Sequence, residues 1–158
     1  MIDQILGVKT MNYTIEKLPP QPILYMRRVG AYGIENFELM TALKEWANSK
    51  DLFIDSIIYG IAHDDESIPP EECRYDVCLV TALDILADPA VKRGEIPAGN
   101  YAVFTIDHTA EAVQKFWASI IPRLQEENLQ WDRQKPILER YKYRVIEDGK
   151  CEFCVPIL

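Results

Sequence analysis

The stretch Lys135–Val145, KPILERYKYRV, alternates apolar and charged side chains and predicts a β-strand. Successive side chains of a strand point to opposite faces. One face would carry Ile137, Glu139, Tyr141, Tyr143 and Val145, and the other Leu138, Arg140, Lys142 and Arg144. The second face is basic, and we expect it to contact water. Glu139 stands on the apolar face, where an unpaired carboxylate is costly, so we expect it to serve a function.

The elements on either side of this strand have clear boundaries. Residues 150–158, KCEFCVPIL, predict a closing strand after the turn EDG. Upstream, residues 90–107 contain two short extended segments separated by PAGN. Thr109 is then expected to cap the helix AEAVQKFWASIIPRLQEEN, with Glu111 in its first turn. Pro122 lies inside this pattern and should kink or end the helix near Ile121.

The first half of the chain has the same order of elements. Val8–Leu18 and Ile23–Val29 predict strands separated by PPQP, and residues 34–50 follow at helical spacing. The strands DSIIYGIAH and CRYDVCLV come next, joined by the acidic loop DDESIPPEE. Strand, helix, strand, strand therefore occurs twice. This order predicts an α+β fold of duplicated βαββ units, with a curved, mainly antiparallel sheet, two helices on one face and a ligand groove where the halves meet.

The composition limits the classes of function. A chain of 158 residues with 48% hydrophobic and 27% charged residues predicts one globular domain. The formal net charge of −8 argues against direct nucleic-acid binding and suits a cationic ligand. The N-terminus lacks the features of a signal peptide, and no apolar run is long enough to span a membrane. We therefore expect a cytoplasmic protein with no membrane partner.

The four cysteines are expected to be reduced thiols in the cytosol. Cys73 and Cys78 form C-x4-C, and Cys151 and Cys154 form C-x2-C, which raises zinc as a hypothesis. Odd spacings within strands point the thiols to opposite faces, which disfavours a shared metal. His63 and His108 have no Ser or Cys motif beside them, and a phosphate loop is absent. We predict no metal or other cofactor.

Several segments, taken in order, resemble one family. They are ILYMRRVGAYG, EWANSKDL, SIIYGIAHDDES, CRYDVCLV, IPAGNYAVF, KFW, PILERY and CEFCVPI. This ordered set resembles the gyrase-inhibitor-like (GyrI-like) small-molecule-binding domain, which is also the effector-binding half of some AraC-type and MerR-type transcription regulators. The resemblance covers residues 11–158 and leaves 1–10 as an N-terminal extension. It implies two pseudo-symmetric βαββ units with a cleft between them.

The resemblance also implies a range of functions. Regulator members bind bulky aromatic or cationic drugs, a multidrug-binding property, with an acidic residue on the strand that matches PILERY, where this chain has Glu139. Some stand-alone members are described as hydrolases that open cyclopropane rings of DNA alkylators, a detoxification role, and one is named for inhibiting DNA gyrase. The sequence leaves no room for a DNA-binding helix-turn-helix, so we expect a stand-alone domain rather than a complete regulator.

Eight residues are considered for the site. Glu139 either lies at a sheet edge or pairs with a buried Arg or Lys, or it lies in the cleft as a cation partner or general base. The other candidates are core residues or line the ligand pocket: Tyr59, Tyr75, Tyr101, Tyr141 and Trp117. Trp46, the counterpart of Trp117, is expected in the core. Glu152 lies opposite Cys151, Phe153 and Val155, so we expect it to face solvent or cover the other side of its strand.

The leading hypothesis is a protein that binds an aromatic, electrophilic or cationic small molecule. If it is an enzyme, Glu139 would deprotonate a water that attacks a strained ring carbon held against Trp117, while Tyr75 stabilises the developing oxyanion. One alternative is a non-catalytic sequestering or sensor module. Another is a protein-interaction role on a topoisomerase or a separate regulator, for which the acidic loop would be the first segment to mutate.

Overall fold

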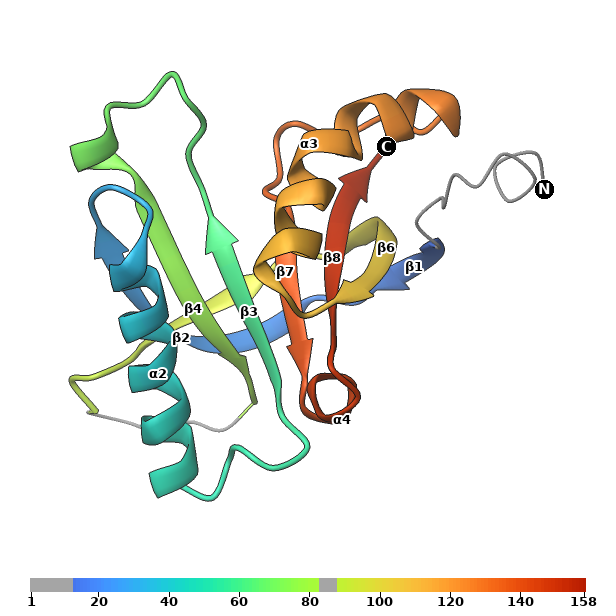
Figure 1. Ribbon diagram of the computed structural model, residues 1–158. Helices are drawn as coiled ribbons and strands as arrows, with labels where there is room; N and C mark the ends of the chain where they lie inside the picture. Colours follow the sequence, from blue (N-terminus) through green and yellow to red (C-terminus); the bar gives the residue numbers. More distant parts are fainter. Residues whose placement is uncertain (1–12, 83–87) are drawn as a thin grey trace.

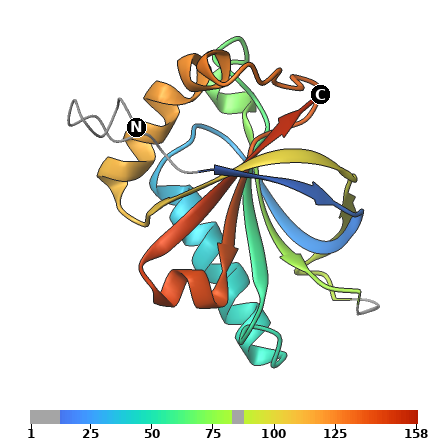
Figure 2. The same ribbon diagram turned by 90° about the vertical axis from the view of Figure 1, so that its right-hand side faces the viewer.

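The computed structural model of this chain describes residues 13–82 and 88–158. Within these residues the strands are β1 (Tyr13–Leu18), β2 (Gln21–Val29), β3 (Ile57–Ala62), β4 (Arg74–Val80), β5 (Lys92–Ile96), β6 (Gly99–Asp107), β7 (Leu138–Lys142) and β8 (Lys150–Ile157). The helices are α2 (Ile34–Ser49), the 3-10 turn η1 (Pro70–Glu72), α3 (Ala110–Glu126) and α4 (Tyr143–Glu147). Figures 1 and 2 show that the strands form one strongly curved sheet.

The strand order reveals the duplication. The sheet runs β1-β6-β8-β7-β3-β4-β2-β5, and every neighbouring pair is antiparallel. Strands β2, β3 and β4 with helix α2 form one βαββ unit, and β6, β7 and β8 with α3 form the other. The two units meet where β3 pairs with β7. The α+β class and the duplicated unit predicted from the sequence are therefore confirmed.

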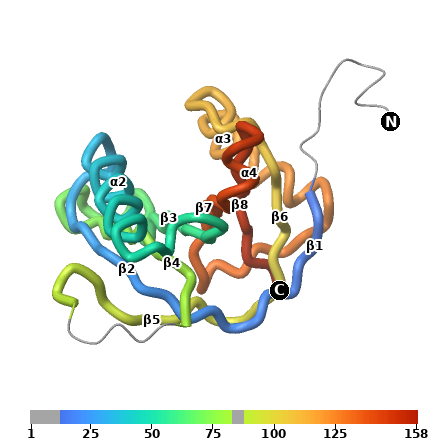
Figure 3. Tube along the Cα trace, turned by 90° about the horizontal axis from the view of Figure 1, so that it is seen from below, coloured from blue at the N-terminus to red at the C-terminus, as the bar shows by residue number. Residues whose placement is uncertain are grey.

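One row of cross-strand partners crosses the sheet on its helix-covered face. From β1 to β2 the row contains Tyr13, Phe104, Phe153, Glu139, Gly60, Val77 and Met26. Helix α2 packs Met40, Leu43 and Ala47 over one end of this row, and α3 packs Phe116, Ile120 and Leu124 over the other. Figure 3 shows both helices on the same side of the sheet. The centre of the row lies at the β3–β7 junction, between the two helices.

Helix α3 begins as its sequence predicts and continues past its proline. Thr109 is extended, and its Oγ1 accepts a hydrogen bond of 3.1 Å from the backbone N–H of Ala112. The helix does not end near Ile121 but runs through Pro122 to Glu126, and its path bends in the second half (Figure 1). Leu124, beyond the proline, is buried in the core, and its packing compensates for the backbone hydrogen bond that proline cannot donate.

The strand predicted over Lys135–Val145 is too long. Strand β7 ends at Lys142, whose partner Ile57 is the first residue of β3. The described residues just before Ile57 are not in a strand, so the ladder ends at this pair, and Tyr143 and Val145 lie in α4 instead. The Tyr143 ring packs edge-on against Phe53, at 5.4 Å between centroids. In the first half, the expected strand from Val8 is observed from Tyr13, and its first five residues lie outside the described ranges.

The face opposite the helices is apolar and buried at its centre, contrary to the prediction of a wet, basic face. Arg140 is 2% exposed, because this side is the concave interior of the curved sheet. Its side chain pairs with Glu152 at 3.0 Å and with Glu16 at 3.1 Å. Around it, a second core cluster includes Tyr59, Tyr101, Val103, Leu138 and Cys154. The side chains of β7 alternate between the two faces as predicted, but the sheet is covered on both faces.

Candidate functional site

Three predicted site residues meet at the centre of the helix-covered face. Glu139 is the cross-strand partner of Gly60. A Cβ atom at Gly60 would lie 3.6 Å from Glu139 Oε2 and would collide with the Tyr75 hydroxyl. The Tyr141 hydroxyl donates a 2.6 Å hydrogen bond to Glu139 Oε2. The carboxyl of Glu139 and the two phenols therefore converge over a position that only glycine leaves open.

Glu139 lacks a charge partner in the part of the chain that the structure describes. The nearest arginine in sequence, Arg140, points to the other face and is held by Glu152 and Glu16. No ion pair joins Glu139 to any residue among 13–82 and 88–158. Burial raises the pKa of the Glu139 carboxyl, and the hydrogen bond from Tyr141 offsets this only partly. The described structure therefore does not pair Glu139 with a buried Arg or Lys, which was one of the alternatives for this residue.

The two phenols are protonated donors. Burial, reinforced by the negative charge of Glu139, raises the pKa of both Tyr75 and Tyr141. Tyr75 packs with Val77 and Leu79 in the cluster under α2, on the face that the sequence predicts. The Tyr141 ring touches the clusters under both α2 and α3. The Tyr141 proton is already donated to Glu139 Oε2, so the Tyr75 hydroxyl is the one that can donate a hydrogen bond to an anion or a carbonyl over Gly60.

Trp117 lies beside the site rather than within the core. Its ring meets Phe153 edge-on, with 5.4 Å between centroids, and Phe153 is the cross-strand partner of Glu139. The residue is 41% exposed, which leaves part of the indole available to a ligand. Its counterpart Trp46 is partly buried against the core under α2, and its Nε1 donates to Asp88 Oδ2 at 2.8 Å.

Two basic residues that the sequence did not place in the site flank Tyr141. Lys44 Nζ lies 6.0 Å from the centre of the Tyr141 ring, and the His108 ring lies 5.5 Å from it. Burial lowers the pKa of Lys44. The pKa of His108 is lowered mainly by burial and to a smaller extent by the charge of Lys44. Lys44 is on α2, four residues after Met40 and three before Ala47, both of which are buried against the sheet. Residues at this spacing share one helix face, and this was the one sequence signal that could have placed Lys44 over the sheet.

A pocket of about 130 Å³ opens next to Tyr141 at the junction of the halves. We call it the helix-face pocket, and it is lined by Lys44, Phe53, Ser56, Ile58, Tyr141, Tyr143, Ile146 and Glu147. The lining comes from α2, β3, β7 and α4, so both βαββ units contribute to it. This is the region in which the sequence predicts a ligand groove.

Tyr59 and Tyr101 do not join this site. Both belong to the core cluster on the concave face, and they are 0% and 1% exposed. The Tyr59 hydroxyl donates to Gln21 Oε1 at 2.9 Å. Glu152 is also on that face and is 8% exposed, so of the two expectations for it, coverage of the other side is correct and exposure to solvent is wrong.

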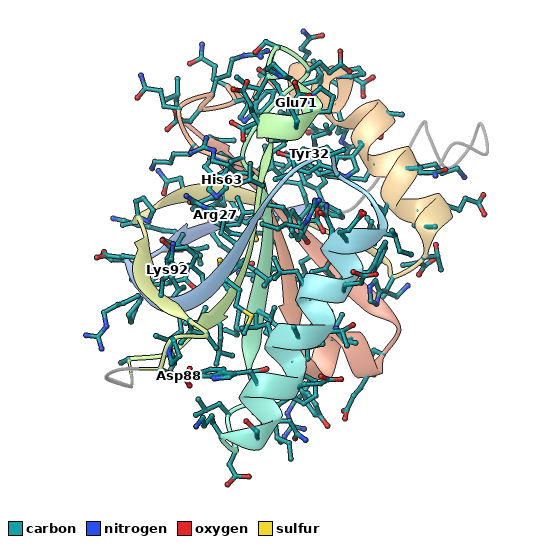
Figure 4. All side chains as sticks on the ribbon, turned by 90° about the vertical axis from the view of Figure 1, so that its left-hand side faces the viewer. Arg27, Tyr32, His63, Glu71, Asp88 and Lys92 are labelled. Atoms are coloured by element: carbon teal, nitrogen blue, oxygen red, sulfur yellow. The ribbon has the colours of Figure 1, made fainter. Side chains whose placement is uncertain are left out.

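The acidic loop of residues 64–72 is partly structural. Arg74 holds Asp64 at 2.9 Å, and its hydrogen bonds lower the pKa of that carboxyl to about 2. Glu66, Glu71 and Glu72 are exposed, and Figure 4 shows Glu71 at the outer end of the molecule. These three residues, rather than Asp64, are the ones to replace in a test of protein interaction.

The thiols and the helices add two further observations. All four cysteines are buried and free, and within the described ranges no group of three His, Cys, Asp or Glu side chains is arranged to hold a metal. Among the helices of residues 13–82 and 88–158, none combines the length and apolar character needed to cross a bilayer.

Taken together, the fold and the site define a duplicated βαββ domain with a desolvated carboxyl group beside aromatic side chains at the junction of its halves. Residues 11–158 match the family model described as the GyrI-like small molecule binding domain, and the chain belongs to this family. The family predicted from the sequence is therefore confirmed, and so is small-molecule binding as the character of the domain.

Three similar proteins extend this comparison. The chain is 46% identical over 149 residues to the "SPbeta prophage-derived putative transcriptional regulator YosT" of Bacillus subtilis (strain 168), which covers 93% of this chain and 99% of that protein. EcmrR, solved in a complex with DNA, matches with a TM-score of 0.76 at 9% identity; the alignment covers 99% of this chain but only 60% of EcmrR. SAV2435 bound to tetraphenylphosphonium matches with a TM-score of 0.61 at 13% identity, covering 94% of each chain. The two structures share the fold with this chain.

Proposed function

We propose that this protein binds an aromatic or apolar cation on its helix-covered face, with Glu139 as the charge partner. The observation that carries the proposal is a desolvated carboxyl without a cationic partner among the described residues, set in a row of aromatic side chains. A bound cation would offset the cost of burying this charge, so the protein gains more from a charged ligand than from a neutral one.

The surroundings of Glu139 support an aromatic ligand. The exposed part of Trp117 offers a ring face that attracts cations. Tyr141, which contacts Glu139, lines the helix-face pocket and provides further apolar surface. A structural neighbour that carries tetraphenylphosphonium agrees with this chemistry. We retain the expectation of a cytoplasmic location as part of the proposal.

Calorimetric titration with tetraphenylphosphonium tests the proposal. Glu139→Gln should weaken binding by about tenfold or more, because it removes a buried charge partner but keeps the shape. Glu111→Gln is the matched control, since that side chain is 83% exposed on α3, and it should leave the affinity unchanged. Neutral triphenylphosphine oxide should bind the wild type weakly. Equal affinity of the wild type and Glu139→Gln for the cation would refute the proposal.

A second candidate is hydrolysis of a cyclopropane-bearing electrophile, which would make the protein a detoxifying enzyme. It is favoured by the raised pKa of Glu139 and by the Tyr75 hydroxyl directed at the same space. Glu139 would take a proton from water as the water oxygen bonds to a ring carbon. The ring bond to that carbon breaks, and its electron pair moves to a conjugated carbonyl oxygen, to which Tyr75 donates a hydrogen bond.

Mass spectrometry of cyclopropane-bearing alkylators incubated with the protein separates the two candidates. Hydrolysis predicts a product heavier by one water that the wild type and Glu111→Gln form and Glu139→Gln does not. Recovery of bound but unchanged compound would reject hydrolysis for the compounds tested and leave Glu139 as a charge partner only.

A further inference from the structure

The concave face of the sheet carries a hollow that is larger than the helix-face pocket. This barrel-face groove has a volume of about 290 Å³, against about 130 Å³ for the helix-face pocket. Its apolar floor consists of Ile23, Ile61, Cys78, Ile96 and Leu138. These residues come from both βαββ units and from β5, so the groove exists only in the folded sheet. The sheet itself separates it from Glu139, which lies on the opposite face.

Two aromatic residues border the groove. Tyr25 on β2 is partly exposed, whereas Tyr101 on β6 is only 1% exposed and offers little ring surface. A Cβ atom at Gly94 would lie only 3.0 Å from Cε1 of Tyr25, so the absence of a side chain at Gly94 lets this ring lie close against β5. An accessible aromatic ring beside an aliphatic floor suits a flat, apolar body.

One end of the groove is a polar cluster of three residues. Asp76 is 4% exposed and accepts hydrogen bonds from Arg27 Nε at 2.7 Å and from Arg27 Nη2 at 2.8 Å. His63 Nε2 lies 2.7 Å from Asp76 Oδ2. Burial alone would raise the pKa of Asp76, but the hydrogen bonds from Arg27 and His63 lower it, so Asp76 is an ionised acceptor and His63 Nε2 is the donor. Figure 4 shows Arg27 and His63 next to one another.

This cluster leaves hydrogen-bonding capacity for a ligand. With Nε and Nη2 on Asp76, Arg27 retains Nη1, which bonds to no other group in the described part of the chain. Lys135, which also lines the groove, lies over Gly99 and donates to the Ala98 carbonyl at 3.0 Å, leaving two of its three protons. Arg27 and Lys135 are therefore cationic donors with free protons at the groove. Of the two carboxylates in its lining, Asp76 is buried and already satisfied, and Glu95 is exposed to solvent, as is the neutral Gln134.

We infer that the barrel-face groove is a second binding site, which takes a small planar anion such as an aromatic carboxylate. The ring would lie against Tyr25 and the aliphatic floor, and the carboxylate would accept hydrogen bonds from Arg27 Nη1 or Lys135 Nζ. The volume, at the lower end of the range for ligand pockets, limits the ligand to about one or two fused rings. The net charge of −8 opposes an anion only weakly, because salt screens distant charges beyond about 8 Å whereas these donors are in contact.

Titration of the protein with 2-naphthoate, followed through backbone amide NMR signals, tests the inference. Saturable binding should perturb the amides of Tyr25, Gly94 and Tyr101. Lys135→Met should weaken it by about tenfold, the energy of one charge-assisted hydrogen bond. Lys17→Met, an exposed residue outside the groove, is the matched control. The double variant Arg27→Gln with Asp76→Asn removes both charges together, so that no unpaired carboxylate is left to unfold the protein, and should also weaken binding.

Two comparisons distinguish this site from the one at Glu139. Naphthoate binding should be unchanged in the Glu139→Gln variant and in the presence of saturating tetraphenylphosphonium. Neutral 2-naphthalenemethanol should bind at least about tenfold more weakly than naphthoate, because it lacks the negative charge. Displacement of naphthoate by tetraphenylphosphonium, perturbation confined to the helix-covered face, or no saturable binding to the wild type would overturn the inference. Failure of the proposal for Glu139 would not affect these outcomes.

Discussion

Glu139 on β7 and Gly60 on β3 are direct cross-strand partners at the junction of the two βαββ units. Because Gly60 has no side chain, the Glu139 carboxyl and the Tyr75 hydroxyl both extend over its backbone. A single missing side chain therefore creates the space in which the charged and hydrogen-bonding groups of the site converge.

The first prediction concerns Gly60→Ala. The added methyl group collides with the Tyr75 hydroxyl, so the variant should lose about 1–3 kcal/mol of unfolding free energy and bind tetraphenylphosphonium more weakly. Urea denaturation measures the loss. Combining Gly60→Ala with Tyr75→Phe should recover much of this stability, because the colliding oxygen is gone. Additive losses in the double variant would mean that the two positions are not in contact.

A second prediction follows from the raised pKa of Glu139. Because the folded-state pKa exceeds the ordinary value of 4.5, ionisation costs more in the folded chain than in the unfolded one. The stability contributed by Glu139 therefore falls as pH rises from 4.5 through the folded-state pKa. Glu139→Gln should be more stable than the wild type at neutral pH, and the difference should disappear in acid.

Urea denaturation at a series of pH values measures this difference directly. Subtracting the wild-type free energy of unfolding from that of Glu139→Gln removes the titration of all other groups. Glu111→Gln, treated in the same way, should give a curve without this slope. A difference for Glu139→Gln that is constant with pH would show that the carboxyl titrates normally.

The third prediction concerns the buried ion cluster behind Glu139. Arg140→Met leaves the buried Glu152 with only Lys142, at 3.9 Å, as a cationic partner, and it should cost about 3 kcal/mol of stability. Arg144→Met is the matched control, because Arg144 is 80% exposed in its pair with Asp55 and should contribute less than about 1 kcal/mol. Replacing Glu152 with Gln in the Arg140→Met background should reduce the loss. Similar thermal denaturation of the two single variants would contradict the assignment.

The fourth prediction concerns thiol reactivity. Burial raises the pKa of Cys151 to about 11 and that of Cys154 to about 12, so neither forms an appreciable amount of thiolate near neutral pH. A colourimetric disulfide reagent should label the native protein very slowly and label all four cysteines after denaturation. Rapid labelling of the native chain would show that one of these thiols is accessible, and peptide mapping would identify it.

Several features of this protein were determined locally and could be predicted from the sequence. Helical spacing places α2, the Thr109 hydroxyl caps α3, and alternation puts Tyr75 on the same face as Val77. The repeated order of elements predicts the duplicated fold. Each of these features depends on residues within a few positions of one another, so periodicity and capping preferences are sufficient to predict them.

Other features depend on which distant strands pair, and only the tertiary structure decided them. The alternation of side chains along β7 predicts that Glu139 and Arg140 lie on opposite faces. It does not reveal that the curved sheet buries both faces, so the sequence predicts an exposed Arg140, whereas the structure buries it. It also could not show that Tyr59 and Tyr101 lie across the sheet from Glu139, or that Lys44 reaches Tyr141 from another element. Burial and convergence arise from cross-strand partners far apart in sequence, and a local pattern contains no information about them.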